Sequence, residues 1–530
     1  MKPQAKQIFW NALLLSAATL LMRSVGVIFG VYLTNRAGAE TMGLFSLMGG
    51  VYGFALTLAT SGIQFGVTRL TVEAIGRGEK ERVRRIIRRA MLYALLFGLG
   101  AMLLLMSLAS PIGIHWLKDA RTVRSLRLFG LTLPLISLSS VWNGYFTAVR
   151  RVYKNAVVQV FEQALKIIGT VYLLSLFLPS GVEGTCYALI LGGALAELGS
   201  FLLNFLLYLI DRKRNFPSVS KQSAAEGRAL LGITLPIAFT AYLRSGLLTL
   251  QHILIPEGLR NSGASHAAAL VAYGSIHNMA LPVILYPAAL ISSFSGLLIP
   301  ALAESNVKKE NIRIGYMIRR VWWLSLIFSI GVAGILICFS EELGELLYPN
   351  SNAGYYIRLL SPLIPIMYVD TATDAMLKGL GQQVYSMNVN IIDAALSVAL
   401  VLLLIPRMGI NGYIITIYVS EFFNTVLSIT RLLCIKQIKP ALLKWIYKPL
   451  FCIIIATVSV RAVLTRLPSS AISAKGAIVH CLTVLLCYFL LLIITKSIEK
   501  EDVRWFKTLF ENKKDQNVHK PHKRAHRPDQ

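Results

Sequence analysis

Long apolar stretches recur along the 530-residue chain and constrain its fold more than any other feature. Hydrophobic residues make up 55% of the sequence and charged residues only 15%. A soluble domain of this size cannot bury that much apolar surface, so the composition predicts an all-α integral membrane protein. Fourteen stretches are long enough to cross about 30 Å of hydrocarbon as helices. They lie near residues 8–34, 42–68, 90–114, 127–149, 155–178, 185–210, 229–256, 271–302, 315–340, 355–377, 384–405, 411–435, 446–465 and 476–495.

The hydrophilic joints between these stretches alternate in charge. One set carries the basic clusters, such as residues 77–89, 212–214 and 308–320, whereas the opposite set has few basic residues apart from 118–127. Because basic joints stay on the cytoplasmic side, we expect a multi-pass membrane protein with both termini in the cytoplasm. The net charge of +27 then faces the cytoplasm and anionic lipids, so we expect no nucleic-acid partner.

Short motifs recur in the same order in the two halves of the chain. Pro134-Leu135-Ile136 returns as residues 362–364, residues 181–184 return as 409–412, and an Arg-Ser pair occurs in each half. This duplication predicts two parallel six-helix lobes related by an axis along the membrane normal. The expected boundaries are an N-terminal lobe at 1–210, a cytoplasmic linker at 211–228, a C-terminal lobe at 229–436, two added spans at 437–496 and a basic cytoplasmic tail at 497–530.

The two Arg-Ser pairs place Arg23 and Arg244 deep inside apolar spans, each about fifteen residues past the start of its span. At about 1.5 Å per residue, both guanidinium groups lie near the middle of the bilayer. A charge at that depth costs about 2.5–3.5 kcal/mol or more, so it normally faces a water-filled cavity or a partner. We therefore predict that both arginines line a cavity that holds an anion; the alternative is a structural bridge to a carboxylate on a neighbouring span.

Other polar side chains inside the predicted spans are weaker candidates. Lys166 can contribute to the cavity or form a local ion pair with Glu162, four residues away on the same helix face. His277 can titrate near neutral pH and precedes Pro282, one of several prolines expected to kink spans 8 and 10. The candidate ion-coupling groups or charge partners are the carboxylates Glu162, Glu197, Asp370, Asp374, Asp393 and Glu421.

No catalytic motif accompanies these residues. The sequence has no GxxxxGK[ST] loop for ATP, no HExxH and no GxSxG, and its six cysteines are not paired at metal-ligand or CxxC spacing. We therefore expect no catalytic residue, no cofactor and no metal site. Transport would draw on an ion gradient, the membrane potential or the gradient of the substrate.

Two parts of the sequence resemble a known family. RSVGVIFGVYLTNRAGAETMGLFSL followed by ATSGIQFGVTRL is similar to the start of the polysaccharide-exporter branch of the multidrug/oligosaccharidyl-lipid/polysaccharide (MOP) flippase superfamily. HNMALPVILYPAALISSFSGLLIPALAES resembles the stage V sporulation protein B and MviN-type lipid II flippases. The resemblance implies a protein of the bacterial plasma membrane, with a V-shaped cavity that alternates its access and with Arg23 at a cavity position. His277 stands near the place of an arginine in the MviN-type pattern, which favours the sporulation-protein-like branch.

The sequence thus predicts a flippase that moves a polyprenyl-pyrophosphate-linked glycan, a peptidoglycan or polysaccharide precursor, from the inner to the outer leaflet. Its expected partners are this lipid-linked glycan and membrane lipids, with cell-wall synthesis proteins as further candidates. One alternative is a cation-coupled multidrug exporter of the same superfamily, in which Asp370, Asp374 or Asp393 would be the main functional groups and the arginines would be structural. Another is a membrane-embedded glycosyltransferase or ligase, which would usually carry larger extracytoplasmic loops than this sequence offers.

Overall fold

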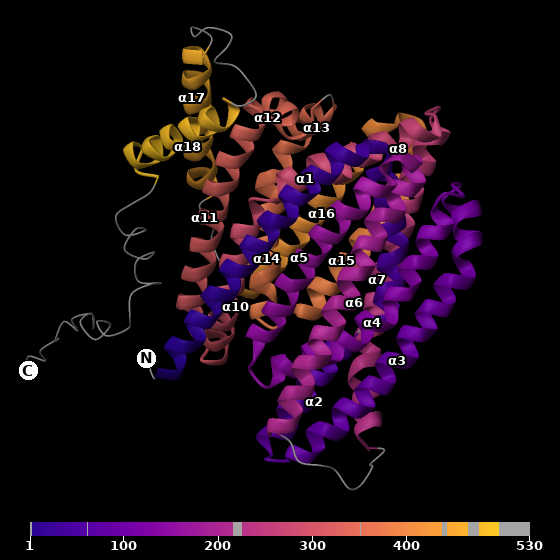
Figure 1. Ribbon diagram of the computed structural model, residues 1–530. Helices are drawn as coiled ribbons and strands as arrows, with labels where there is room; N and C mark the ends of the chain where they lie inside the picture. The colour runs from indigo at the N-terminus through magenta and orange to yellow at the C-terminus, as the bar shows by residue number, and fades with distance from the viewer. Residues whose placement is uncertain are drawn as a thin grey trace, which may run out of the picture.

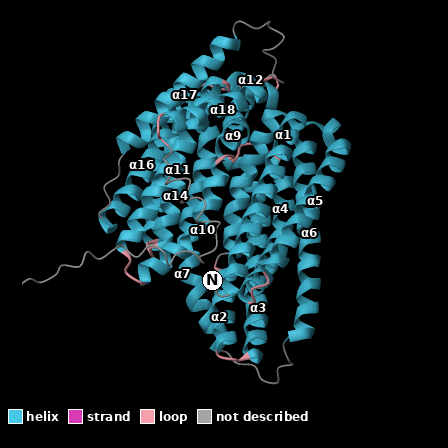
Figure 2. Ribbon diagram, turned by 90° about the vertical axis from the view of Figure 1, so that its left-hand side faces the viewer, coloured by secondary structure: helices cyan, strands magenta, loops and turns pink. Residues whose placement is uncertain are grey.

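The computed structural model describes residues 3–60, 62–215, 225–349, 351–436, 442–464 and 476–497. Within these ranges all regular structure is helical, which confirms the predicted all-α class. Long helices stand side by side in a tilted bundle (Figure 1), joined mostly by short loops (Figure 2). We call the end where α8, α12 and α13 lie the α8 end, and the opposite end, where α2 lies, the α2 end (Figure 1).

The first half of the chain builds one group of helices. Its longest member consists of two helical segments that meet at a kink at Gly38, whose φ of +82° glycine adopts without strain. The first predicted span lies before the kink, and the second begins after it and ends within α2. The helices are α1 (Pro3–Thr60), α2 (Ile63–Gly76), α3 (Lys80–Pro111), η1 (Ile112–Trp116), α4 (Thr122–Ala148), α5 (Val152–Phe177), η2 (Leu178–Ser180) and α6 (Gly181–Asn215).

The second half builds a similar group with more interruptions. Proline breaks two of its predicted spans, as expected: one is divided around Pro282 and Pro287, and the other at Pro362. The helices are α7 (Ala225–Asn261), α8 (His266–Gly274), η3 (Ser275–Ala280), α9 (Leu281–Leu285), α10 (Ala288–Val307), α11 (Asn311–Cys338), α12 (Ser340–Leu347), α13 (Ala353–Leu360), η4 (Ser361–Leu363), α14 (Ile364–Gly379), α15 (Gln383–Met408) and α16 (Ile410–Lys436).

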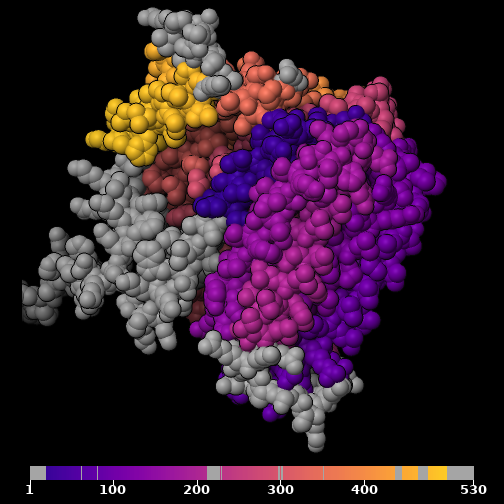
Figure 3. All heavy atoms as spheres, viewed as in Figure 1, coloured from indigo at the N-terminus to yellow at the C-terminus, as the bar shows by residue number. Residues whose placement is uncertain are grey.

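Two further helices, α17 (Leu442–Leu464) and α18 (Ala477–Ile494), lie at the edge of the molecule beside α11 (Figures 1 and 3). Both helices pack against glycines of α11. A Cβ added at Gly334 would lie 2.3 Å from Ile453 of α17, and one at Gly331 would lie 2.7 Å from Tyr488 of α18. The Tyr488 hydroxyl donates to the carbonyl of Ile327 at 2.8 Å. This close approach is the packing expected of helices in lipid, where small residues replace the hydrophobic effect.

Eleven helical segments of the described residues are long and apolar enough to cross a membrane. Two of them, Leu20–Gly76 with 57 residues and Val152–Asp211 with 60 residues, are long enough for two crossings each. The predicted tenth span, residues 355–377, is absent from this set. The chain is therefore a multi-pass membrane protein, and the number fourteen remains a prediction.

Packing within each half is extensive. α3 packs on α4 and α5 on α6 in the first half, while α14 packs on α10, α11 and α16 in the second. The two halves meet mainly where α1 contacts α7 and α8. This arrangement fits the predicted lobes, whose division stays a prediction because half of the expected linker, residues 216–224, and the tail from residue 498 lie outside the described residues.

Candidate functional site between the two halves

The two Arg-Ser pairs occupy matching places at the contact between the halves. Ser24 on α1 shares a hydrogen bond of 2.7 Å with the Tyr286 hydroxyl, which follows α9. Ser245 on α7 accepts a hydrogen bond of 3.1 Å from Thr57 on α1. Each serine therefore bonds to the other half of the chain, so the repeated motif marks the interface from both sides.

The arginines of these pairs remain exposed, in contrast to the serines. Neither Arg23 nor Arg244 forms an ion pair within the described residues. Arg23 lies within electrostatic range of the Tyr368 hydroxyl, and Arg244 within range of the Asp393 carboxylate. The predicted alternative, a direct bridge to Glu197 or Glu421, is not seen among these residues. Both guanidinium groups thus keep donors available for an external anion.

Close backbone contacts close the interface from its middle to the α8 end. A Cβ at Gly43 would lie 2.2 Å from the carbonyl oxygen of Leu270, and one at Gly274 would lie 2.5 Å from that of Ala39. Asn278 on η3 donates to the carbonyl of Met42 at 2.9 Å and accepts from Ser46 at 2.7 Å. The helices can approach this closely because the facing positions are glycine, and the half-buried Asn278 amide bonds across the contact in both directions.

The structure places His277 in a ring cluster at this interface. Its imidazole stacks on Tyr273 with centroids 5.4 Å apart and meets His252 edge-to-face at 5.1 Å. His252 Nδ1 and the Tyr273 hydroxyl share a hydrogen bond of 2.8 Å. A Cβ at Gly50 of α1 would touch His252 at 2.9 Å, so the cluster is held against the other half. Contact between His277 and a substrate stays a prediction.

The structure also shows a polar network at the α8 end that the sequence did not predict. Asp119 accepts hydrogen bonds from Arg121 Nη2 at 2.7 Å and from His266 Nε2 at 3.1 Å. Lys118 pairs with Glu257 of α7. Since residues 118–121 belong to the first half and residues 257–266 to the second, these contacts fasten the halves together. We call them, with the Arg121–Glu40 pair at 3.3 Å and the Glu257–Arg260 pair, the α8-end latch.

The electrostatics of the latch favour ionised Asp119. Burial alone would raise the pKa of this carboxyl group, whose side chain is only 5% exposed. Hydrogen bonds from Arg121 and His266 outweigh that effect and hold the pKa below its ordinary value. The same contacts raise the pKa of Arg121 further above its ordinary value. The pair is therefore charged at every physiological pH.

A sequence signal for the latch did exist. The basic residues of 118–127 were the exception to the charge alternation of the joints, and acidic side chains stand in the neighbouring joints on the same predicted side. Basic residues on the cytoplasmic side set the orientation of a membrane protein, whereas basic residues on the opposite side have no such role. We would therefore expect the latter to pair with carboxylates. That expectation could have indicated Glu40, Asp119 and Glu257 as their partners.

The predicted polar residues of the first half come together on α5 and α6. The charges of Glu162, Lys166 and Glu197 interact with one another, and both carboxylates also act on the Tyr52 hydroxyl of α1. Lys166 is exposed, whereas the two glutamates are half-buried. The three side chains thus form one polar group beside Tyr52 of α1. Arg23 lies on the same helix, closer to its N-terminus.

The predicted carboxylates of the second half also come together. Asp370 and Asp374 on α14, Asp393 on α15 and Glu421 on α16 act on one another electrostatically. Several have local donors: Ser386 and Lys378 bind Asp374, and Ser420 donates to Asp393 at 2.6 Å. Among the described residues no three metal-ligating side chains lie close enough to hold a metal ion.

Known proteins resemble this chain over most of its length. The family described as "Polysaccharide biosynthesis protein" matches residues 8–304. Stage V sporulation protein B of Bacillus subtilis (strain 168) is 24% identical over 509 residues, which cover 94% of this chain and 98% of that protein. Lipid II flippase MurJ of the same organism is 22% identical over 446 residues, which cover 78% of this chain and 80% of that protein.

Solved structures show the same fold. "Lipid II flippase MurJ, inward closed conformation" superposes with a TM-score of 0.69 at 12% identity, over 94% of this chain and 100% of that one. "Inward-facing conformation of a multidrug resistance MATE family transporter of the MOP superfamily" gives a TM-score of 0.59 at 17% identity, over 79% of this chain and 96% of that one. The predicted resemblance to the MOP superfamily is confirmed, and the chain belongs to the polysaccharide biosynthesis protein family.

Proposed function

We propose that the protein is a flippase that moves a polyprenyl-pyrophosphate-linked glycan from the cytoplasmic to the outer leaflet by alternating access. The observation that carries this proposal is the pair of exposed guanidinium groups of Arg23 and Arg244, presented by matching motifs from the two halves. Guanidinium binds phosphate oxygens through two parallel N–H donors, so two of them suit a pyrophosphate. The names of the relatives, a sporulation protein and a lipid II flippase, support the same substrate class.

The proposed geometry gives each half one contact with the headgroup. Because Ser24 and Ser245 each bond to the opposite half, a movement of the halves at this interface would shift both arginines. The polyprenyl tail would remain in the lipid. The α8-end latch would close the extracytoplasmic side while substrate enters from the cytoplasmic side, with both chain termini in the cytoplasm.

The test is flipping of a fluorescent lipid-linked oligosaccharide by purified protein in liposomes, read as the labelled fraction that reaches the opposite leaflet. Charge-assisted contacts are worth about 1.5–3 kcal/mol each, so Arg23→Ala or Arg244→Ala should weaken substrate binding about ten- to a hundredfold. Lysine replacements should rescue only partly, because a point charge cannot reproduce the planar fork. Arg407→Ala, at an exposed arginine near the end of α15, is the matched control and should transport normally.

Two outcomes would contradict the proposal. Full transport by a folded Arg23→Ala, Arg244→Ala double variant would exclude the anion site. Loss of either single variant from the membrane would instead indicate that the arginine neutralises a buried carboxylate. Breaking such a pair by removing one partner typically destabilises a protein by about 3–5 kcal/mol.

A cation-coupled exporter is the second candidate, and one observation favours it. Asp393 interacts electrostatically with both Arg244 and Glu421, so a cation bound among these carboxylates would change the charge that Arg244 experiences. Asp393→Asn should then abolish transport driven by a sodium or proton gradient and spare exchange without one. Unchanged gradient dependence in that variant would remove this candidate.

A further inference from the structure

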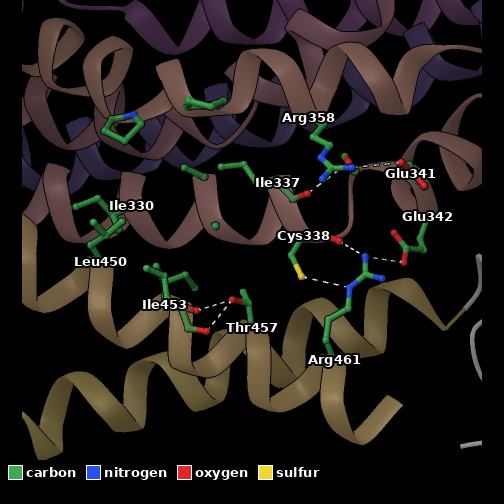
Figure 4. Close-up of a pocket in the computed structure, with 16 residues that line it drawn as sticks. Ile330, Ile337, Cys338, Glu341, Glu342, Arg358, Leu450, Ile453, Thr457 and Arg461 are labelled. Carbon is green, nitrogen blue, oxygen red and sulfur yellow. Dashed lines mark hydrogen bonds and ion pairs between the residues drawn. The ribbon is translucent and has the colours of Figure 1, made fainter. Parts of the chain in front are cut away.

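A pocket of about 640 Å³ lies away from the inter-half interface, between α11, α17 and the α12–α14 segment (Figure 4). Its size is that of sites that enclose small organic ligands. None of the candidate site residues or latch residues lines it. It joins the second half of the chain to the added helix α17, close to the α8 end (Figure 1).

The inner walls of the pocket are two apolar helix faces. α11 contributes Ile330, Gly334 and Ile337, and α17 contributes Leu450 and Ile453, all at the i, i+3/i+4 and i+7 spacings of single helix faces. From Ile330 to the end of α11 at Cys338 the wall runs about 12 Å along the helix axis. An apolar slot of this depth fits part of a hydrocarbon chain.

The mouth of the pocket carries two cations and two anions. Arg461 pairs with Glu342 at 3.1 Å, and Arg358 pairs with Glu341 at 3.6 Å (Figure 4). The Arg461 guanidinium is also fixed by Cys338, whose carbonyl and Sγ accept from it. The formal charges sum to zero, which matches a zwitterion better than an anion.

One atom at this mouth lacks a hydrogen-bond donor. Glu342 Oε2 is buried and, among the described residues, receives no hydrogen bond, although Oε1 of the same carboxylate binds Arg461. A buried carboxylate oxygen without a donor is costly, so it indicates a missing ligand or water. A ligand that satisfies it must bring N–H or O–H groups, and a cation does so best.

We propose that this pocket binds a zwitterionic phospholipid with a primary ammonium headgroup, such as phosphatidylethanolamine. One acyl chain lies between the faces of α11 and α17, the ammonium donates to Glu342 Oε2, and the phosphate lies against Arg461 and Arg358. An anionic lipid lacks the donor for Glu342, and a polyprenyl pyrophosphate brings several negative charges against two carboxylates. The bound lipid would tie α17 to the second half of the chain.

The experiment measures lipid retention by native mass spectrometry. Full-length protein is stripped of lipid in detergent and then exposed to equal amounts of phosphatidylethanolamine and phosphatidylglycerol. We expect one phosphatidylethanolamine per chain to be retained preferentially. Glu342→Gln should reduce this preference about tenfold, because it removes the charge that receives the ammonium.

A second variant tests the apolar slot. Thr457 lines the pocket on α17, so Thr457→Phe should fill the slot and abolish retention. Val458→Phe is the matched control, because Val458 is the next residue, is 61% exposed and does not line the pocket. Both variants are compared by gel filtration and thermal unfolding.

Three results would overturn the proposal. Equal retention in Thr457→Phe and Val458→Phe would place the lipid elsewhere, and equal retention of the two phospholipids in the wild type would exclude headgroup selection. Displacement of phosphatidylethanolamine by an equimolar polyprenyl phosphate would assign the pocket to the transport route instead. None of these measurements requires flipping activity, so the lipid site is tested independently of the proposed function.

Discussion

His266→Ala is the sharpest test of the α8-end latch, because it removes one contact between the halves and, within its own half, only the 3.4 Å contact of the ring with Arg260. His266 on α8 donates to Asp119 at 3.1 Å and belongs to the other half of the chain. Asp119 keeps its hydrogen bonds from Arg121 at 2.7–3.0 Å, so the variant leaves no unpaired buried charge. The expected effect is therefore a shift in the equilibrium between closed and open α8 ends rather than unfolding.

The size of the shift follows from the burial of Asp119. A hydrogen bond to a charged group contributes about 1.5–3 kcal/mol, and we take the lower end because Arg121 continues to bind the carboxylate. A change of about 1.4 kcal/mol corresponds to a tenfold change in an equilibrium constant, so the open population should rise about tenfold. The Lys118–Glu257 pair is more exposed, at 48% and 25%, so Lys118→Ala should add at most about 1 kcal/mol.

The assay is a distance distribution between spin labels at Ile114 and Ala267, two exposed positions on opposite sides of the latch. The six native cysteines are replaced first, and the protein is studied in nanodiscs. Arg127→Ala is the control, because Arg127 contacts Ser110 within the first half at the same end. His266→Ala should populate a longer distance that the control lacks.

The same assay tests the protonation of Asp119. The pKa of this group is depressed in the latch, so its contribution is fully present above the ordinary aspartate pKa and is lost only as the pH falls through the lower, latched value. Between pH 7 and pH 5 Asp119 should not contribute to opening. A distribution unaffected by His266→Ala, or shifted equally by Arg127→Ala, would refute the latch.

Three other predictions concern packing and topology. Gly43→Ala should open or destabilise the interface at a cost of about 1–3 kcal/mol, because the added Cβ would lie 2.2 Å from a carbonyl oxygen of α8. Gly53→Ala is its control: the added Cβ meets nothing within 4 Å, so thermal unfolding and the spin-label distances should stay unchanged. Asp211→Ala should lower the unfolding temperature of the purified protein strongly, because it leaves a buried lysine on α5 without the carboxylate that it binds at 2.7 Å. Reporter fusions at Ser218 and Asn352 should report cytoplasmic and extracytoplasmic locations, and the reverse result would contradict the proposed orientation.

The sequence predicted the fold well because the strongest physical constraint on this chain is local. The backbone N–H and C=O groups of a membrane span must hydrogen-bond within the span, so each apolar stretch predicts a helix independently of the others. Predicted breaks also appeared where proline removes a backbone donor, at Pro282 and Pro362. The kink at Gly38 was expected only as a joint, because sequence does not distinguish a loop from a single residue of positive φ that connects two helical segments.

The sequence predicted the site less completely because partner choice is not local. Arg23 and Arg244 were selected by depth alone, but the contacts of Ser24 and Ser245 with the opposite half depend on how helices far apart in the sequence come together. The latch depends on three joints that meet only after the halves assemble. The placement of His277 against Tyr273 likewise follows from the π-helical turn of η3, for which the sequence carries no clear signal.

The latch and the arginines constrain each other energetically. Opening the α8 end breaks the Asp119–His266 and Lys118–Glu257 contacts, a cost of about 1.5–2.5 kcal/mol by the values above. A ligand can shift that equilibrium only by the difference in its affinity for the closed and open states. Two guanidinium contacts with a pyrophosphate supply about 3–6 kcal/mol if both form in only one state. One contact alone would supply about 1.5–3 kcal/mol, which only balances the latch. Under the proposed function a substrate therefore has to engage Arg23 and Arg244 together to open the α8 end with a margin, and a carrier that lacks either arginine should bind its substrate and open only partly.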